Sequence, residues 1–260
     1  MPNLVMTWKV KEYKRLASTQ LTADRFGRDG ASEGTVVLAE EQTAGRGRFE
    51  RRWASPKGGL YMSLVLRPAR LDSPHLLTLV GALSVVEGVK IATGIHSGIR
   101  WPNDVMFKGR KVAGVLGTAH YSGSSPDYVV VGIGVNCNQS ERSPGGLWPS
   151  STSLMEALGA KVDLKAIRDR VLDSFDRIYL RWQKGADKEI MREVASLLTT
   201  LGREVEFKRL GLKPQTGVAQ KLSDEGSLLV KVGGRRVIAL KAERVEWLKE
   251  KESGRSQVQS

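Results

Sequence analysis

The segment from Gln42 to Trp53 concentrates residue types that bind anions. It reads Gln-Thr-Ala-Gly-Arg-Gly-Arg-Phe-Glu-Arg-Arg-Trp, with four arginines within seven residues. Planar guanidinium groups suit phosphate and carboxylate, and glycines let a backbone approach a ligand closely. Trp53 could cover an apolar or adenine surface, and the glycines would let such a loop close on binding. A solvated basic turn has the same composition, so this segment alone leaves both interpretations open.

A second polar segment precedes an apolar strand. Residues 100–104 read Arg-Trp-Pro-Asn-Asp, and the proline favours an extended conformation of Trp101, which makes the turn stiff. Lys111 opens the strand that follows at 112–117, where its ammonium group is well placed to pair with a carboxylate. The alternative is a polar turn followed by an ordinary surface lysine.

A third segment, residues 131–136, has glycines inside an apolar strand and reads Val-Gly-Ile-Gly-Val-Asn. Glycines at such positions often mark the close approach of a ligand or of another backbone. Asn136 could then read a polar group such as an adenine edge. A tightly packed strand without a ligand fits the same pattern.

Several common catalytic motifs are missing from the sequence. It contains no G-x-x-x-x-G-K-[ST] loop, no dinucleotide fingerprint and no G-x-S-x-G elbow. The three histidines, His75, His96 and His120, lack metal-ligand spacing, so we expect no metal site. These absences argue against P-loop, hydrolase and zinc-enzyme functions.

The elements that must position these segments fall into two groups. The first is α/β: after Ser18-Thr19-Gln20 we expect a short helix, then buried strands at 35–39, 60–66, 112–117 and 128–135. A helix is predicted from Ser73-Pro74 to Gly94, and another after the capping residue Asp163. Residues 122–126 and 138–152 are predicted to be a turn and a loop.

The second group is all-β. Short strands are predicted near 203–207, 216–221, 227–232, 235–240 and 244–248, which suggests a small barrel. We therefore expect a domain at 1–200, a small β domain at 201–249 and a disordered tail at 250–260.

Composition bounds the location and the partners. The single cysteine, Cys137, excludes an intramolecular disulfide and fits a reducing compartment. The sequence begins without a signal-peptide pattern, and no run approaches the eighteen or so apolar residues that span a membrane. We expect a soluble, cytoplasmic protein. The formal net charge of +13 favours polyanionic or acidic partners, or reflects a generally basic surface.

Together and in this order, the segments resemble the biotin protein ligases. The family's Ser-Thr-Asn, Gln-x-x-Gly-Arg-Gly-Arg, Lys-Trp-Pro-Asn-Asp, Lys-x-Ala-Gly-Ile-Leu and Gly-x-Gly-x-Asn elements correspond here to Ser18–Gln20, Gln42–Arg48, Arg100–Asp104, Lys111–Leu116 and Gly132–Asn136. The match covers residues 12–248. Departures stand at Gln20, Glu50, Arg100 and Thr118, and only about a dozen residues precede the matched region, as in the monofunctional ligases.

The resemblance implies a fold and an activity. The fold is a mixed β-sheet flanked by helices, like the class II synthetase-like catalytic domain, with a small SH3-like barrel. The biotin carboxylate attacks the α-phosphorus of Mg·ATP, giving biotinyl-adenylate and pyrophosphate. A lysine of a biotin carboxyl carrier protein then displaces AMP. Biotin and ATP with Mg are substrates, and no tightly bound prosthetic group is expected.

The resemblance also implies roles for single residues. Asp104 would deprotonate or orient the incoming lysine, or would simply cap a turn. The implied catalytic residues are Arg46, Arg48, Lys111 and Asp104. The implied biotin-binding residues are Ser18, Thr19, Gln20, Gln42, Gly45, Arg46, Gly47, Arg48, Lys111 and Gly114. The implied ATP- or adenylate-binding residues are Arg48, Arg51, Trp53, Asn103 and Asn136.

Two rival functions remain open at this point. A lipoate ligase or related acyl-protein ligase shares the adenylate chemistry, although the Gly-Arg-Gly-Arg loop favours biotin. A basic nucleic-acid-binding protein would explain the charge, but the sequence carries no nucleic-acid motif. We expect no membrane association and no specific DNA binding, and the sequence leaves a homodimer open.

Overall fold

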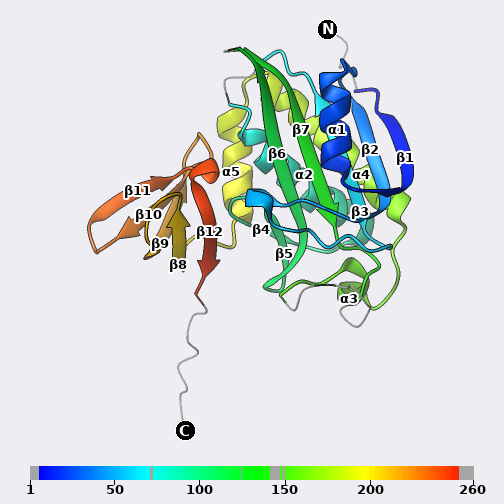
Figure 1. The fold of residues 1–260 in the computed structure, drawn as a ribbon. Coiled ribbons are helices and arrows are strands. Elements are labelled where there is room, and N and C mark those ends of the chain that lie inside the picture. Colours follow the sequence, from blue (N-terminus) through cyan, green and yellow to red (C-terminus); the bar gives the residue numbers. More distant parts are fainter. Residues whose placement is uncertain (1–5, 71–72, 124, 141–146, 148–149, 252–260) are drawn as a thin grey trace.

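A mixed seven-stranded sheet forms the larger part of the molecule (Figure 1). The computed structural model describes residues 6–70, 73–123, 125–140, 147 and 150–251. The sheet order is β1-β2-β3-β7-β6-β5-β4. Its strands are β1 (Lys9–Leu16), β2 (Thr35–Gln42), β3 (Leu60–Leu66), β4 (Gly98–Arg100), β5 (Asp104–Phe107), β6 (Arg110–Ser122) and β7 (Ser125–Val135). Only the β1–β2 pair is parallel among these neighbours. The predicted α/β class with a mixed sheet is confirmed.

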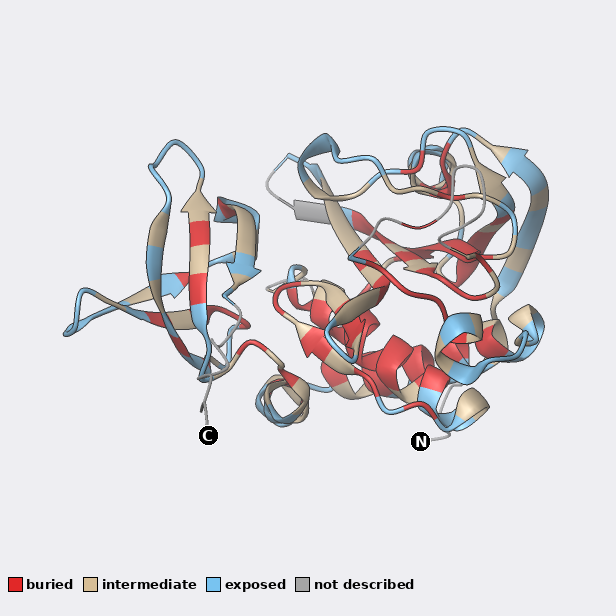
Figure 2. Cartoon of the chain, turned by 90° about the horizontal axis from the view of Figure 1, so that it is seen from below, coloured by how far each residue is buried: buried red, intermediate tan, exposed pale blue. Residues whose placement is uncertain are grey.

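Helices cover both faces of this sheet. Helix α1 (Thr19–Arg28) packs against β2, β3 and β7 on one face, while α2 (Leu76–Thr93) and α4 (Leu164–Gln183) are stacked on the other. In Figure 2 the inner surfaces of this helical layer are largely buried. Because both faces are covered, β3 is buried along its whole length and shows no alternation of polar and apolar residues. Shorter helices are α3 (Leu154–Leu158) and α5 (Asp187–Leu197).

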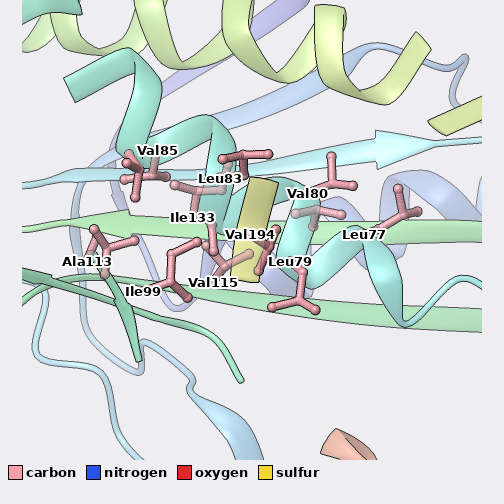
Figure 3. Packing of buried hydrophobic residues seen from close by; sticks show 14 of the residues in the cluster. Leu77, Leu79, Val80, Leu83, Val85, Ile99, Ala113, Val115, Ile133 and Val194 are labelled. Atoms are coloured by element: carbon pink, nitrogen blue, oxygen red, sulfur yellow. The ribbon is translucent and has the colours of Figure 1, made fainter. Parts of the chain in front are cut away.

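Helix α2 supplies the centre of the core. Figure 3 shows its Leu79, Val80 and Leu83 among Val115 of β6 and Ile133 of β7. The helix ends at Gly94 in the left-handed conformation, as predicted, but it begins at Leu76 rather than at Ser73-Pro74. With a mean hydropathy of 1.6 over 18 residues it is apolar and long enough to cross a membrane, contrary to our expectation from the sequence. Its burial inside the fold accounts for that apolarity.

Five short strands form a second, antiparallel sheet. They are β8 (Glu204–Arg209), β9 (Gln215–Leu222), β10 (Leu228–Val232), β11 (Arg236–Leu240) and β12 (Val245–Glu250), in the order β11-β10-β9-β8-β12. All five predicted strands are therefore confirmed, and the sheet fits an SH3-like domain. Closure into a barrel is not found, because β11 and β12 stay unpaired with each other within the described part of the chain.

The predicted boundaries have different outcomes. The domain division at residue 200 stays a prediction. The tail predicted from residue 250 begins inside strand β12, and from residue 252 onward it lies outside the described residues. The loop predicted at 138–152 also lies partly outside them.

Candidate active site

The floor of the site lies at the end of strand β7, where glycines take the place of larger residues on one face. Alternate residues of a strand share one face, and on the α1 side these are Tyr128, Val130, Gly132 and Gly134. Tyr128 and Val130 pack beneath α1 in a small apolar cluster. Gly134 then pairs with Gly114 of β6, so that bare backbone faces outward there. The missing side chains leave room above the sheet just beyond the N-terminus of α1, and Trp53 and Gln20 approach the backbone closely there.

A cavity of about 320 Å³ lies over this floor. It brings together all three segments that the sequence singled out, and also the N-terminal turn of α1. The predicted site residues that line it are Ser18, Thr19, Gln20, Gln42, Arg46, Gly47, Arg48, Arg51, Trp53, Asn103, Asp104, Lys111 and Gly114.

A hydrogen-bond network holds the α1 end of the cavity. Thr19 donates from its backbone N–H and its hydroxyl to Gln42 Oε1, at 2.7 and 3.1 Å. Gln42 Nε2 donates to Ser55 Oγ at 2.8 Å, and Ser63 Oγ donates to Thr19 Oγ1 at 2.9 Å. The buried hydroxyl of Ser18, by contrast, has no partner among the described residues. An orphaned buried hydroxyl at a cavity wall is suited to a polar ligand.

Lys111 and Asp104 form the charged side of the cavity. Asp104 pairs with Arg100 at 2.6 Å and with the Lys111 ammonium group, which also lies 4.9 Å from the Trp53 ring centroid. Burial alone would raise the pKa of Asp104, but the charges and hydrogen bonds of Lys111 and Arg100 outweigh it and lower the pKa below its ordinary value. Since a carboxylate with a lowered pKa is a weak base, this geometry makes Asp104 an anchor for Lys111.

The loop over the cavity is closed at its base and strained at its tip. Isolated β-bridges join Gln42 to Ser55 and Arg46 to Arg52. At the tip, Phe49 and Glu50 have φ angles of 52° and 57°. The left-handed region is unfavourable for residues other than glycine, at a cost of order 1–3 kcal/mol each. The loop conformation is thus held by its contacts rather than by its own backbone preferences.

Two loop arginines contact the C-terminal sheet. Arg48 Nη2 donates to the carbonyls of Ala242 and Val245, at 2.5 and 2.8 Å. Arg51 Nη2 donates to the carbonyl of Glu246 at 3.1 Å. Burial lowers the pKa of Arg48 to about 10, so the guanidinium stays protonated at neutral pH. Arg48, which the resemblance implies to be a catalytic and ATP-binding residue, is therefore bound to neutral carbonyls in this structure.

Trp53 lies directly on the glycine floor. A methyl group added to Gly134 would lie 2.8 Å from its Cε2, and one added to Gly114 would lie 3.1 Å from its Cζ3. The glycines therefore do permit a close approach, here by a side chain of the same protein. The indole Nε1 is buried without a partner among the described residues, and it offers a donor to a ligand.

Three predicted ligand contacts have other positions or partners. Gly45 does not line the cavity, and its carbonyl accepts from the Trp53 N–H at 2.9 Å, which closes the loop base. Asn136 also lies off the cavity, because it is buried and its Nδ2 donates to the Thr152 carbonyl at 3.0 Å. Asn103 does line the cavity, yet its Nδ2 donates to the Val115 carbonyl at 2.9 Å. In all three cases the group predicted to contact a ligand is hydrogen-bonded within the protein and stabilises the local backbone.

Sequence reasoning missed several residues that line the cavity. They are Met62, Ser63, Ser150 and Ser151, and residues 246–248 of β12. Arg52 and Arg100 also line it, in segments that the sequence singled out without giving these two a site role. The sequence does carry a signal for Ser63. Ser63 and Tyr61 are the two residues with a hydroxyl group in the otherwise apolar strand 60–66. Residues 246–248 gave no local signal, because only the packing of the two sheets brings them to the loop.

Comparison with known proteins gives a consistent result. The model of the Biotin/lipoate A/B protein ligase family matches residues 13–136. The bifunctional ligase/repressor BirA of Bacillus spizizenii is 37% identical over 218 residues, covering 83% of this chain and 67% of the relative. The biotin--[acetyl-CoA-carboxylase] ligase of Mycobacterium tuberculosis is 31% identical, covering 79% and 76%. The structure of biotin protein ligase from Aquifex aeolicus in complex with biotin and ATP aligns with a TM-score of 0.81 and 32% identity, over 94% of this chain and 99% of that one.

Proposed function

Because this chain belongs to the Biotin/lipoate A/B protein ligase family, we propose that it is a biotin–protein ligase that activates biotin with ATP and transfers it to a lysine of a carrier protein. One observation carries this proposal: a polar helix end, a cation-rich loop and an ion-paired lysine converge on one cavity. Such a cavity can hold a neutral polar head at one end and a carboxylate beside phosphates at the other.

In the first step a biotin carboxylate oxygen bonds to the α-phosphorus of ATP, and the bond from that phosphorus to pyrophosphate breaks. The cavity is lined by six cationic side chains, Arg46, Arg48, Arg51, Arg52, Arg100 and Lys111, against the two carboxylates of Asp104 and Glu246. This excess of positive charge stabilises the phosphates and the charge that develops during transfer. Lys111, held by Asp104, would orient the carboxylate.

Magnesium would enter with ATP. Of the two cavity carboxylates, Asp104 is already bound by Lys111 and Arg100. A small, strongly hydrated cation such as Mg²⁺ is commonly held by substrate phosphates and water. We therefore treat magnesium as part of the nucleotide substrate.

In the second step the acceptor lysine nitrogen bonds to the biotinyl carbonyl carbon, AMP leaves, and the nitrogen loses a proton. We propose a biotin carboxyl carrier protein as the acceptor. Asp104 acts here through Lys111, which holds the adenylate in place. We also propose that residues 1–200 carry the chemistry, and that the protein works in the cytoplasm, where the buried Cys137 would stay reduced.

Pyrophosphate release with Mg·ATP tests this function. We expect release with biotin, and little with lipoate or with no added acid. Pyrophosphate release with lipoate alone would make the protein a lipoate ligase. The absence of release with both acids would contradict the proposal. Arg46→Ala should lower the biotin-dependent rate by about two orders of magnitude, the scale of one preorganised charge donor. Near-normal turnover in that variant would remove Arg46 from the mechanism.

A further inference from the structure

Gln20 bridges the first turn of α1 to the sheet. Its Nε2 donates to Thr118 Oγ1 on β6 at 3.2 Å and to the Val130 carbonyl on β7 at 3.3 Å. Its Oε1 lies 3.2 Å from Ser63 Oγ on β3. Gln20 lines the cavity, whereas Thr118 is not among the residues that line it. The two side chains contact each other directly.

The sheet fixes which way the Gln20 amide points. The Val130 carbonyl can only accept, so it must face the amide NH₂ group, and the Thr118 hydroxyl completes that side. The amide oxygen is therefore turned toward Gly132 and the cavity. Gly132 is required for this arrangement, because a side chain there would overlap the Gln20 oxygen.

Gln20 Oε1 is available to a ligand, because the neighbouring hydroxyl groups have too few protons to satisfy every acceptor. Ser63 has one hydroxyl proton and two neighbouring acceptors, Thr19 Oγ1 at 2.9 Å and Gln20 Oε1 at 3.2 Å. The shorter contact goes to Thr19, whose own proton is donated to Gln42. Gln20 Oε1 then keeps acceptor capacity, and the unpartnered Ser18 hydroxyl offers a donor in the same cavity.

We propose that Thr118 is a positioning residue that orients the Gln20 amide, so that Gln20 Oε1 accepts a hydrogen bond from an N–H group of the substrate's polar head. The Gln20–Thr118 pair thereby sets specificity for an acid whose head carries an N–H donor. This inference rests on the proposed function, in which that acid is biotin.

A purely structural role for Thr118 is the competing explanation, and the chain offers a matched control. Helix α1 is also tied to the sheet through Asp24, which accepts from Tyr128 Oη at 2.8 Å and lies 2.9 Å from His120 Nε2. Docking of the helix thus does not depend on Thr118. Tyr128→Phe removes a hydrogen bond from the same helix–sheet contact without touching Gln20.

The test is the KM for biotin in Mg·ATP-dependent pyrophosphate release. Thr118→Val should raise this KM about tenfold, the weight of one hydrogen bond, with kcat and the KM for ATP changed less than about twofold. Thr118→Ser, which keeps the hydroxyl, should stay near wild type. Tyr128→Phe should lower Tm and leave the KM for biotin unchanged. In a Gln20→Ala background, Thr118→Val should have no further effect.

Three results would overturn the inference: an unchanged KM in Thr118→Val, an equal rise in Tyr128→Phe, or a Thr118→Val effect that persists without the Gln20 amide. Thr118→Ala replaces the valine variant if the latter does not fold. Failure of the proposed function looks different, because then the wild-type protein would already lack biotin-dependent release.

Discussion

The floor of the cavity and the loop that covers it are built in opposite ways. The floor belongs to β3, β6 and β7, which pair along their length in the middle of the sheet. Hydrogen bonds join Ser63 of this floor to Thr19, Gln42 and Ser55, and join Thr118 to Gln20. The loop at 45–53 has two left-handed residues at its tip, and two of its arginines, Arg48 and Arg51, donate to carbonyls within residues 242–246.

The difference separates recognition from closure. A floor fixed by packing and hydrogen bonds has its binding geometry before the substrate arrives, which lowers the entropic cost of binding. A loop held by arginine–carbonyl contacts can exchange them for phosphate, because charge-assisted bonds are the stronger ones. We therefore expect the floor to set which acid binds, and the loop to act on the nucleotide.

The largest expected effect comes from removing the cation on the floor side. Lys111→Ala should lower biotin-dependent pyrophosphate release by about two to three orders of magnitude, because the cation proposed to orient the carboxylate would be lost. Lys57→Ala is the control. Lys57 is exposed, and its ion pair with Glu40 is long, at 4.0 Å. A Lys111→Ala rate within about threefold of wild type would refute the role of this residue.

Asp104→Asn should destabilise the protein by about 3 kcal/mol at neutral pH, because Lys111 and Arg100 would lose a partly buried counter-charge. The pKa of Asp104 is lowered in the folded state from an ordinary value of 3.8. Its contribution is therefore complete above about pH 5 and is lost as pH falls through 3.8 toward the folded-state pKa. Urea unfolding of both proteins from pH 7 to pH 3 measures this. A stability difference independent of pH would contradict the ion-pair account.

Substitutions at two glycines of β7, Gly132 and Gly134, test whether the floor and the loop have separate roles. Gly132→Ala displaces the hydrogen-bonded amide of Gln20 and should raise the KM for biotin about tenfold. Gly134→Ala meets the ring of Trp53, the last residue of the loop, at 2.8 Å. It should change the KM for ATP more than that for biotin. Equal effects of both variants on both substrates would mean that floor and loop act as one unit.

The smallest expected effect concerns strain at the loop tip. Glu50→Gly should raise the free energy of unfolding by about 1 kcal/mol, because glycine adopts the positive φ at Glu50 without strain. Glu50→Ala is the matched control, since it also removes the 3.8 Å contact with Arg46 but keeps a Cβ at the strained position. Thermal unfolding should rank Glu50→Gly above Glu50→Ala. The reverse order would show that the tip is unstrained.

Local chemistry in the sequence predicted several element boundaries. The bounds of β3, the Asp163 cap of α4 and the Gly94 end of α2 follow from local pattern and are confirmed. Edge strand β1 was missed because most of its residues are exposed, so it lacks an apolar pattern. The charged helix α5 was also missed.

What could not be predicted depends on contacts between distant residues. Arg48 meets Ala242 and Val245 across nearly 200 residues of sequence, and no local spacing encodes such a pairing. Asn136 stood in a ligand-like motif, but the fold uses its amide to hold the backbone of Thr152. A motif therefore indicated where the cavity is, while packing decided which of its side chains face that cavity.

Amide hydrogen exchange with and without biotin and Mg·ATP is the most direct test of the division between floor and loop. We predict that residues 45–53 exchange quickly in the free protein and become protected when both ligands are present. Residues 112–118 and 130–135 should already be protected in the free protein and change little. Floor strands that gain protection as much as the loop does, or a loop protected from the start, would contradict the account.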